Sequence, residues 1–138
     1  MSKICGIAIE GSKAIIVILS GSKESFEVKK VAFKKIELEN DADQSQVQSF
    51  RDALLSFFTT EKIDTVGIKG RAKAGEFMAG PISFKIEGII QTLPVTVNII
   101  YPTTIKAQLK KNPLKLTAEE LGLYKYQDDA YTVAYCLL

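Results

Sequence analysis

Residues 3–19 of the chain read KICGIAIEGSKAIIVIL, with apolar runs on either side of a Gly-Ser turn. This pattern predicts a β-hairpin whose strands are buried. Because side chains alternate between the two faces of a strand, Gly6, Ala8 and Glu10 share one face, on which the small residues leave open space. A carboxylate there must be solvated, paired or bound to a cation. Glu10 is therefore a candidate site residue, although an ordinary hairpin whose acidic residue marks the strand end fits the same pattern.

The composition is that of an ordinary globular protein. Of 138 residues, 46% are hydrophobic and 25% are charged, and the net charge is +2, which by itself does not indicate a nucleic-acid partner. The length allows a substantial core, and we expect a single domain over residues 1–138. Because no apolar run is long enough to cross a membrane and no secretory signal pattern is present, we expect a cytoplasmic protein without a membrane partner.

Histidine is absent, and Cys5 and Cys136 are the only cysteines. The lack of histidine excludes Ser-His and Cys-His catalysis and any zinc site with imidazole ligands. The two cysteines stand far apart in the sequence without a CxxC spacing, so we expect both to be buried and reduced. Any chemistry must therefore come from carboxylates, lysines, hydroxyls and a hard cation such as Mg²⁺.

The rest of the chain alternates between strand and helix patterns. Segment 26–39 predicts a third strand with a bulge near Lys34 and Lys35. Periodicity and capping signals then predict a helix over 44–60, a strand over 64–69, a helix from Pro81, a strand over 95–101, a basic helix over 102–110, a turn opened by Thr117 and Glu120, and a last helix from Gln127. We therefore predict an α/β fold with a mixed five-stranded sheet, a three-stranded antiparallel meander plus two parallel strands, flanked by helices.

This order of elements resembles the RNase H-like fold. Over nearly its whole length the chain is similar to Holliday-junction resolvases of the RuvC type. Residues 6–12 stand where that family has Gly-Ile-Asp-Pro-Gly-Ser, and residues 128–134 match the second half of its Asp-Ala-Ala-Asp-Ala-Leu-Ala pattern. Through residues 68–75 and 84–87 the chain also resembles a small bacterial family of unknown function on the same fold.

The resemblance implies a metal-dependent nuclease with Glu10, Lys69, Asp128 and Asp129 as candidate catalytic residues. It places Asp129 at the last catalytic acid and implies Mg²⁺ held by Glu10 and Asp129. Two-metal nucleases need several carboxylates around two cations. The central strand, however, ends in Lys69, where the resolvases carry a glutamate, and a lysine there repels a second cation. We expect Lys69 instead to pair with Glu10 or with a phosphate, and Asp128 and Asp129 also fit a simple helix start.

Basic residues supply candidate nucleic-acid contacts. Lys69, Arg71 and Lys73 alternate in a glycine-rich stretch, and we interpret them as binding branched or single-stranded nucleic acid, although a solvated loop fits the same pattern. A second group of basic and aromatic residues comprises Lys106, Lys110, Lys111, Lys115, Tyr101, Tyr124 and Tyr126. Bases stack on tyrosines, but half-buried core tyrosines fit this group equally well.

Three functions fit the sequence: a Mg²⁺-dependent endonuclease of the resolvase type, a nucleic-acid-binding or scaffold protein with a degraded site, and a protein-interaction module. A homodimer is a further expectation. The first two functions require Glu10, Lys69 and Asp129 to meet at one end of the sheet.

Overall fold

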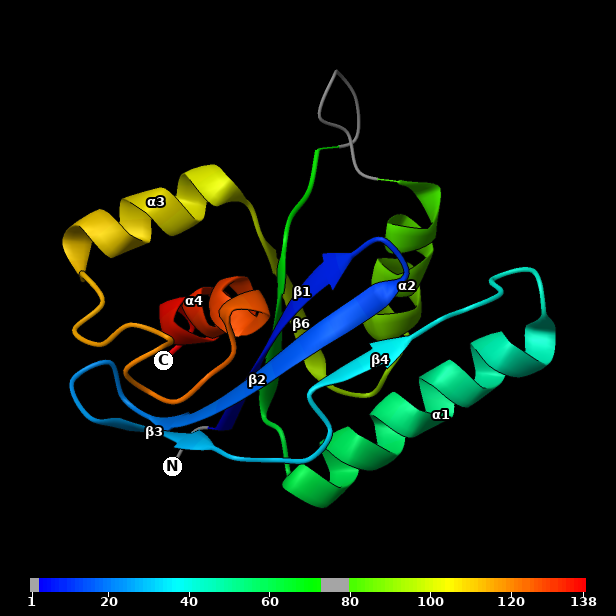
Figure 1. The fold of residues 1–138 in the computed structure, drawn as a ribbon, viewed down its shortest axis with the longest axis horizontal. Coiled ribbons are helices and arrows are strands. Elements are labelled where there is room, and N and C mark those ends of the chain that lie inside the picture. Colours follow the sequence, from blue (N-terminus) through cyan, green and yellow to red (C-terminus); the bar gives the residue numbers. More distant parts are fainter. Residues whose placement is uncertain (1–2, 73–79) are drawn as a thin grey trace.

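The computed structural model describes residues 3–72 and 80–138. Over these residues the strands are β1 (Lys3–Glu10), β2 (Lys13–Gly21), β3 (Phe26–Lys29), β4 (Lys35–Glu37), β5 (Thr65–Lys69) and β6 (Thr96–Ile100). The helices are α1 (Gln44–Glu61), α2 (Pro81–Gln91), α3 (Pro102–Lys111), the 3₁₀ turn η1 (Lys125–Gln127) and α4 (Asp128–Cys136). Figure 1 shows α1 and α2 on one side of the sheet and α3 and α4 on the other.

The sheet is mixed, as predicted, and its order is β3-β2-β1-β5-β6, with β4 also paired to β2. β1 and β2 form the antiparallel hairpin, with Glu10 opposite Lys13. β5 runs parallel to β1 and to β6, with Ile7 opposite Ile68. Parallel strands end at the same edge of a sheet, so the ends of β1 and β5, Glu10 and Lys69, lie at one edge.

The predicted third strand is divided into two, so the sheet has six strands rather than five. β3 ends opposite Ile18 of β2, whereas β4 begins opposite Ile15. Residues 30–34 therefore stand opposite only Ile16 and Val17, and they must leave the regular ladder. A single hydrogen bond, from the Ile16 amide to the Lys34 carbonyl at 2.9 Å, spans the interruption.

The helices begin where the sequence predicts. The Asp43 side chain caps α1 by accepting a hydrogen bond from the Ser45 amide at 3.0 Å, and the hydrogen bonds from Ser45 hold the pKa of Asp43 below its usual value. Pro81 and Pro102 occupy the first turns of α2 and α3, where a missing amide hydrogen has no cost. Over the described ranges, no helix is long and apolar enough to cross a membrane.

Both faces of β1 and β2 are covered, which explains their nearly continuous apolar sequence. The face toward α1 and α2 packs Cys5, Ile7, Ile9, Ile16 and Ile18 against Phe50, Leu54, Phe58, Ile86 and Ile90. The face toward α4 packs Ile4, Ala8, Ile15, Val17 and Leu19 against Ala130, Tyr131, Ala134 and Tyr135. Cys136 packs in a small cluster with Ile100 and Ile105, and both cysteines are buried free thiols.

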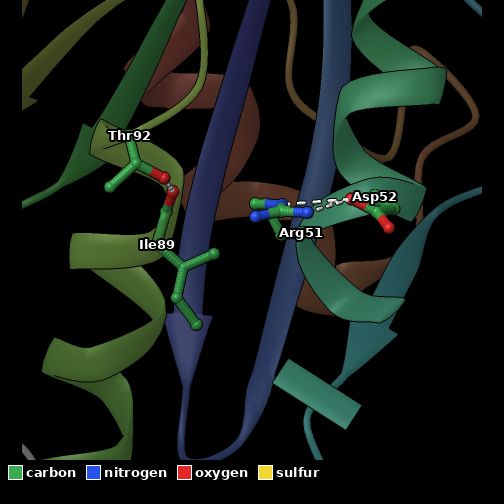
Figure 2. A network of polar contacts seen from close by, with 4 residues as sticks. All are labelled: Arg51, Asp52, Ile89 and Thr92. Atoms are coloured by element: carbon green, nitrogen blue, oxygen red, sulfur yellow. Dashed lines mark hydrogen bonds and ion pairs between the residues drawn. The ribbon is translucent and has the colours of Figure 1, made fainter. Parts of the chain in front are cut away.

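The helices α1 and α2 border a groove of about 470 Å³ that Arg51, Ile89 and Thr92 help to line. Figure 2 shows two polar residues here that bond to near neighbours, Arg51 to Asp52 and the Thr92 hydroxyl to the Ile89 carbonyl. The distances are 2.8 Å and 2.6 Å. Their charges and donors are therefore satisfied locally.

The small residues of β1 bring α4 close to the sheet rather than leaving the open space that the sequence suggested. A Cβ atom on Gly6 would lie 2.8 Å from the Cβ atom of Ala134 and would also collide with the Ala130 carbonyl oxygen. A Cβ atom on Gly67 of β5 would lie 2.8 Å from Cγ1 of Val133. Both contacts are closer than real Cβ atoms allow, so α4 sits at this distance only because both positions are glycine.

Gly6→Val should therefore destabilise the protein by at least about 1–3 kcal/mol, the usual cost of overpacking a core. Gly88→Ala is the matched control, because Gly88 is helical and nothing lies within 4 Å of its added Cβ; this change should stabilise by about 0.5–1 kcal/mol. Urea denaturation measures both, and equal midpoints for Gly6→Val and the wild type would contradict the packing of α4.

Candidate functional site

Four predicted site residues gather where β1 and β5 end and α4 begins. Glu10 is the last residue of β1, and Lys69 is the last residue of β5. Asp128 and Asp129 are the first two residues of α4. The parallel pairing of β1 with β5 and the packing of α4 over both strands place the two strand ends beside the first turn of the helix.

Lys69 forms an ion pair with Asp129 rather than with the predicted Glu10, and 3.1 Å separates Nζ of Lys69 from Oδ2 of Asp129. The two side chains are 31% and 46% exposed. Water screens a pair this exposed, so it contributes no more than about 1 kcal/mol to stability. Its main consequence is local: the Lys69 ammonium group neutralises one carboxylate at the centre of the site.

Glu10, Asp128 and Asp129 line one cavity of about 590 Å³, which we call the acidic cavity. Its other lining residues are Thr117, Ala118, Glu119, Leu123, Lys125 and Tyr126. A smaller hollow of about 290 Å³ lies on the other side of Asp129, and Lys69 and Lys106 help to line it. Asp129 therefore separates an acidic compartment from one that carries two lysines.

One wall of the acidic cavity begins at Thr117, and the tyrosines of α4 bond to residues that precede it in the chain. The Tyr131 hydroxyl donates to the Leu116 carbonyl at 2.7 Å, and the Tyr135 hydroxyl donates to the Pro113 carbonyl at 3.2 Å. Burial raises the pKa of Tyr131 to about 12, so its hydroxyl remains a donor at neutral pH. The predicted capping box is formed next to this wall, with the Glu120 amide 3.1 Å from the Thr117 hydroxyl.

The acids do not form a metal centre in the described part of the chain. Oxygen donors such as these suit Mg²⁺, yet among residues 3–72 and 80–138 no three histidine, cysteine, aspartate or glutamate side chains group closely enough to hold a metal ion. Asp129 is already paired with Lys69. To hold a Mg²⁺ together with Glu10, as the resemblance implies, Asp129 would have to exchange its Lys69 partner for the cation.

Arg71, a predicted nucleic-acid ligand, is directed away from this site. Its guanidinium group lies 2.6 Å from Oε1 of Glu87 on α2 and donates to the Ser83 carbonyl at 3.0 Å. It also lies 4.7 Å from the ring centroid of Phe84. The Arg71 and Glu87 side chains are only 12% and 11% exposed. Arg71 therefore ties the end of β5 to α2 instead of offering its charge to a ligand. The third predicted ligand, Lys73, lies outside the described residues.

The sequence did not identify several residues at the site. Gln127 is buried, and its side-chain amide donates to the Ile16 carbonyl at 3.2 Å while its oxygen accepts from the Tyr124 amide at 3.0 Å. Glu119 and Lys125 line the acidic cavity. The sequence marked this segment by its capping box, by Tyr124 and Tyr126 and by the helix start at Gln127, but none of these signals says what the segment packs against.

Comparison with known sequences identifies the family of this chain. A family model described as "Protein of unknown function (DUF3010)" matches residues 2–137. The chain belongs to that family. A comparison with curated protein sequences gave no match.

Several solved structures share the architecture. RuvC of Thermus thermophilus in complex with Holliday junction substrate is 12% identical with a TM-score of 0.68, over 99% of this chain and 92% of RuvC. The yeast mitochondrial Holliday junction resolvase Ydc2 is 10% identical with a TM-score of 0.60, over 98% of this chain and 77% of Ydc2. Fowlpox virus resolvase with substrate Holliday junction DNA is 14% identical with a TM-score of 0.51, over 96% and 93% of the two chains. At these identities the likeness shows a resolvase-like, RNase H-like fold.

The two basic residues near the end of β5 should differ in their effect on stability. Arg71→Gln leaves the nearly buried Glu87 carboxylate without its partner, and we expect the free energy of unfolding to fall by about 3–5 kcal/mol. Lys69→Gln should change stability by less than about 1 kcal/mol, because its pair is exposed to water. Urea denaturation of the two variants tests this, and equal losses would contradict the separate roles given to these residues.

Proposed function

We propose that this chain binds branched or single-stranded nucleic acid on its resolvase-like fold, with Lys69, rather than a pair of metal ions, as the cation at the centre of the site. The observation that carries the proposal is the Lys69–Asp129 ion pair of 3.1 Å at the edge of the acidic cavity. The RuvC and fowlpox resolvase structures hold Holliday junction DNA, which supports a nucleic-acid partner for the same fold.

The distribution of charge supports a path for the phosphates on the α3 side of Asp129. The hollow there is lined by Lys69 and Lys106. Lys110 and Lys111 are exposed in the last turn of α3. Phosphate groups are attracted by such lysines and repelled by the four carboxylates of the acidic cavity. A bound phosphate would compete with Asp129 for the Lys69 ammonium group.

A metal-dependent endonuclease is the second candidate, because Glu10, Asp128 and Asp129 line one cavity. For metal binding, Asp129 would have to leave Lys69 and the three acids would have to converge. The nucleic-acid-binding function does not need the three acids to converge, and we therefore favour it.

Lys69→Gln and Lys106→Gln should weaken binding to a four-way junction and to a single strand. Each should also reduce the slope of log affinity against log salt concentration by about one. Asp129→Asn should tighten binding, because it frees Lys69 and removes a negative charge. Lys85→Gln is the matched control, since Lys85 is an exposed lysine on α2, across the sheet from α4. Fluorescence anisotropy over a range of salt concentrations measures all four variants.

Two results would contradict this function. If the wild type binds no junction, duplex or single strand at low salt, the chain is an interaction module without a nucleic-acid role. If it cleaves a junction in Mg²⁺ or Mn²⁺, and both EDTA and Asp129→Asn abolish the cleavage, the endonuclease is correct.

A further inference from the structure

Two stacked tyrosines stand at the rim of the acidic cavity. The ring centroids of Tyr124 and Tyr126 are 5.5 Å apart, and the ring planes differ by only 4°. Tyr126 lines the acidic cavity. Tyr124 is 57% exposed, more than any other large hydrophobic side chain in the described residues. The outer ring therefore presents much of its surface to solvent while the inner ring supports it.

Two lysines accompany these rings. The ammonium group of Lys34 lies 5.6 Å from the ring centroid of Tyr124, and that of Lys35 lies 4.9 Å from the ring centroid of Tyr126. Neither lysine has an acidic side chain within ion-pair distance among the described residues. Contacts between a lysine and an exposed ring are weak, so both cations can turn toward an incoming anion.

The segment that carries the tyrosines, residues 123–127, is anchored to the sheet. Buried Gln127 bonds both the Ile16 carbonyl and the Tyr124 amide. Next to the segment, the Lys30 ammonium group donates to the Leu121 carbonyl at 2.7 Å. The position of the rings is therefore fixed by contacts to β2 and to residues 30–34, which connect β3 to β4.

This anchored segment separates two cavities of opposite charge. Leu123 lines the acidic cavity on one side and a second cavity of about 360 Å³ on the other. The second cavity, which we call the basic cavity, is also lined by Lys29, Lys30 and Lys34. A polyanion that approaches the segment is thus attracted by the basic cavity and repelled by the acidic cavity.

We propose that Tyr124, supported by Tyr126, stacks against an unpaired nucleobase, and that Lys34 and Lys35 bind the neighbouring phosphates. The inference deepens the proposed function and rests on it. The face of a base in a continuous duplex is covered by its neighbours, whereas an unpaired base can stack on an aromatic ring. The chain should therefore prefer single strands, or the unpaired nucleotides of a branched substrate, over continuous duplex.

Tyr124→Ala should lower the affinity for oligothymidine about tenfold, the lower part of the range for loss of one base–aromatic stack. It should leave the affinity for a duplex of equal length within about twofold, because a duplex offers no free base face. Tyr124→Phe should bind like the wild type. Leu116→Ala is the matched control, as Leu116 is a large apolar side chain 40% exposed outside the segment. Fluorescence anisotropy measures binding, and circular dichroism verifies the fold of each variant.

A second readout uses the wild type alone. The chain has no tryptophan, so its tyrosine emission can be followed directly, and oligothymidine should quench it more than the duplex does.

The outcomes separate the two proposals. If Tyr124→Ala binds oligothymidine like the wild type while Lys69→Gln weakens binding, the stacking site is wrong and the proposed function stands. If Tyr124→Ala lowers the affinities for oligothymidine and for duplex equally, the ring contacts both ligands in the same way and the proposed base stacking is wrong. If the wild type binds no nucleic acid, both proposals fail.

Discussion

The close approach of α4 to β1 and β5 is the constraint on which the rest of the structure depends. Gly6 and Gly67 provide it, because a side chain at either position would collide with α4. With the helix held there, its first residues lie beside the carboxyl ends of both strands. The ion pair between Lys69 and Asp129 and the shared cavity of Glu10 and Asp128 follow from this packing. The tyrosines of α4 bond to Pro113 and Leu116, which precede the cavity-lining Thr117 in the chain.

The ion pair places a lysine at the centre of a site on a resolvase-like fold. The likeness to resolvases extends over nearly the whole chain at 10–14% identity, so the architecture does not depend on particular site residues. A lysine at the end of β5 supplies fixed positive charge without needing several carboxylates around it. Such a site suits the binding of phosphates more readily than their hydrolysis by two metal ions. Fold and chemistry are thus separable in this chain.

The sequence predicted the parts of the molecule that depend on local patterns. The hairpin, α1 and the parallel strands follow from periodicity and capping, and the convergence of Lys69 with Asp129 follows from strand ends and a helix start. Contacts between distant segments were not predictable. The alternation of Arg71 with Lys69 and Lys73 predicted a nucleic-acid ligand, whereas its ion pair with Glu87, 16 residues away, left no local pattern. The division of the third strand also depends on register with β2. The anchoring role of Gln127 likewise depends on Ile16, 111 residues earlier.

If Lys69 takes the place of a metal ion beside Asp129, as we propose, the site will not bind divalent cations. Isothermal titration calorimetry with Mn²⁺ tests it most directly, because a site of converging carboxylates would release or absorb heat as it fills, whatever its activity. We expect the wild type to show no saturable Mn²⁺ binding and Asp129→Asn to give the same trace. Saturable binding of Mn²⁺ to the wild type that is lost in Asp129→Asn would contradict it.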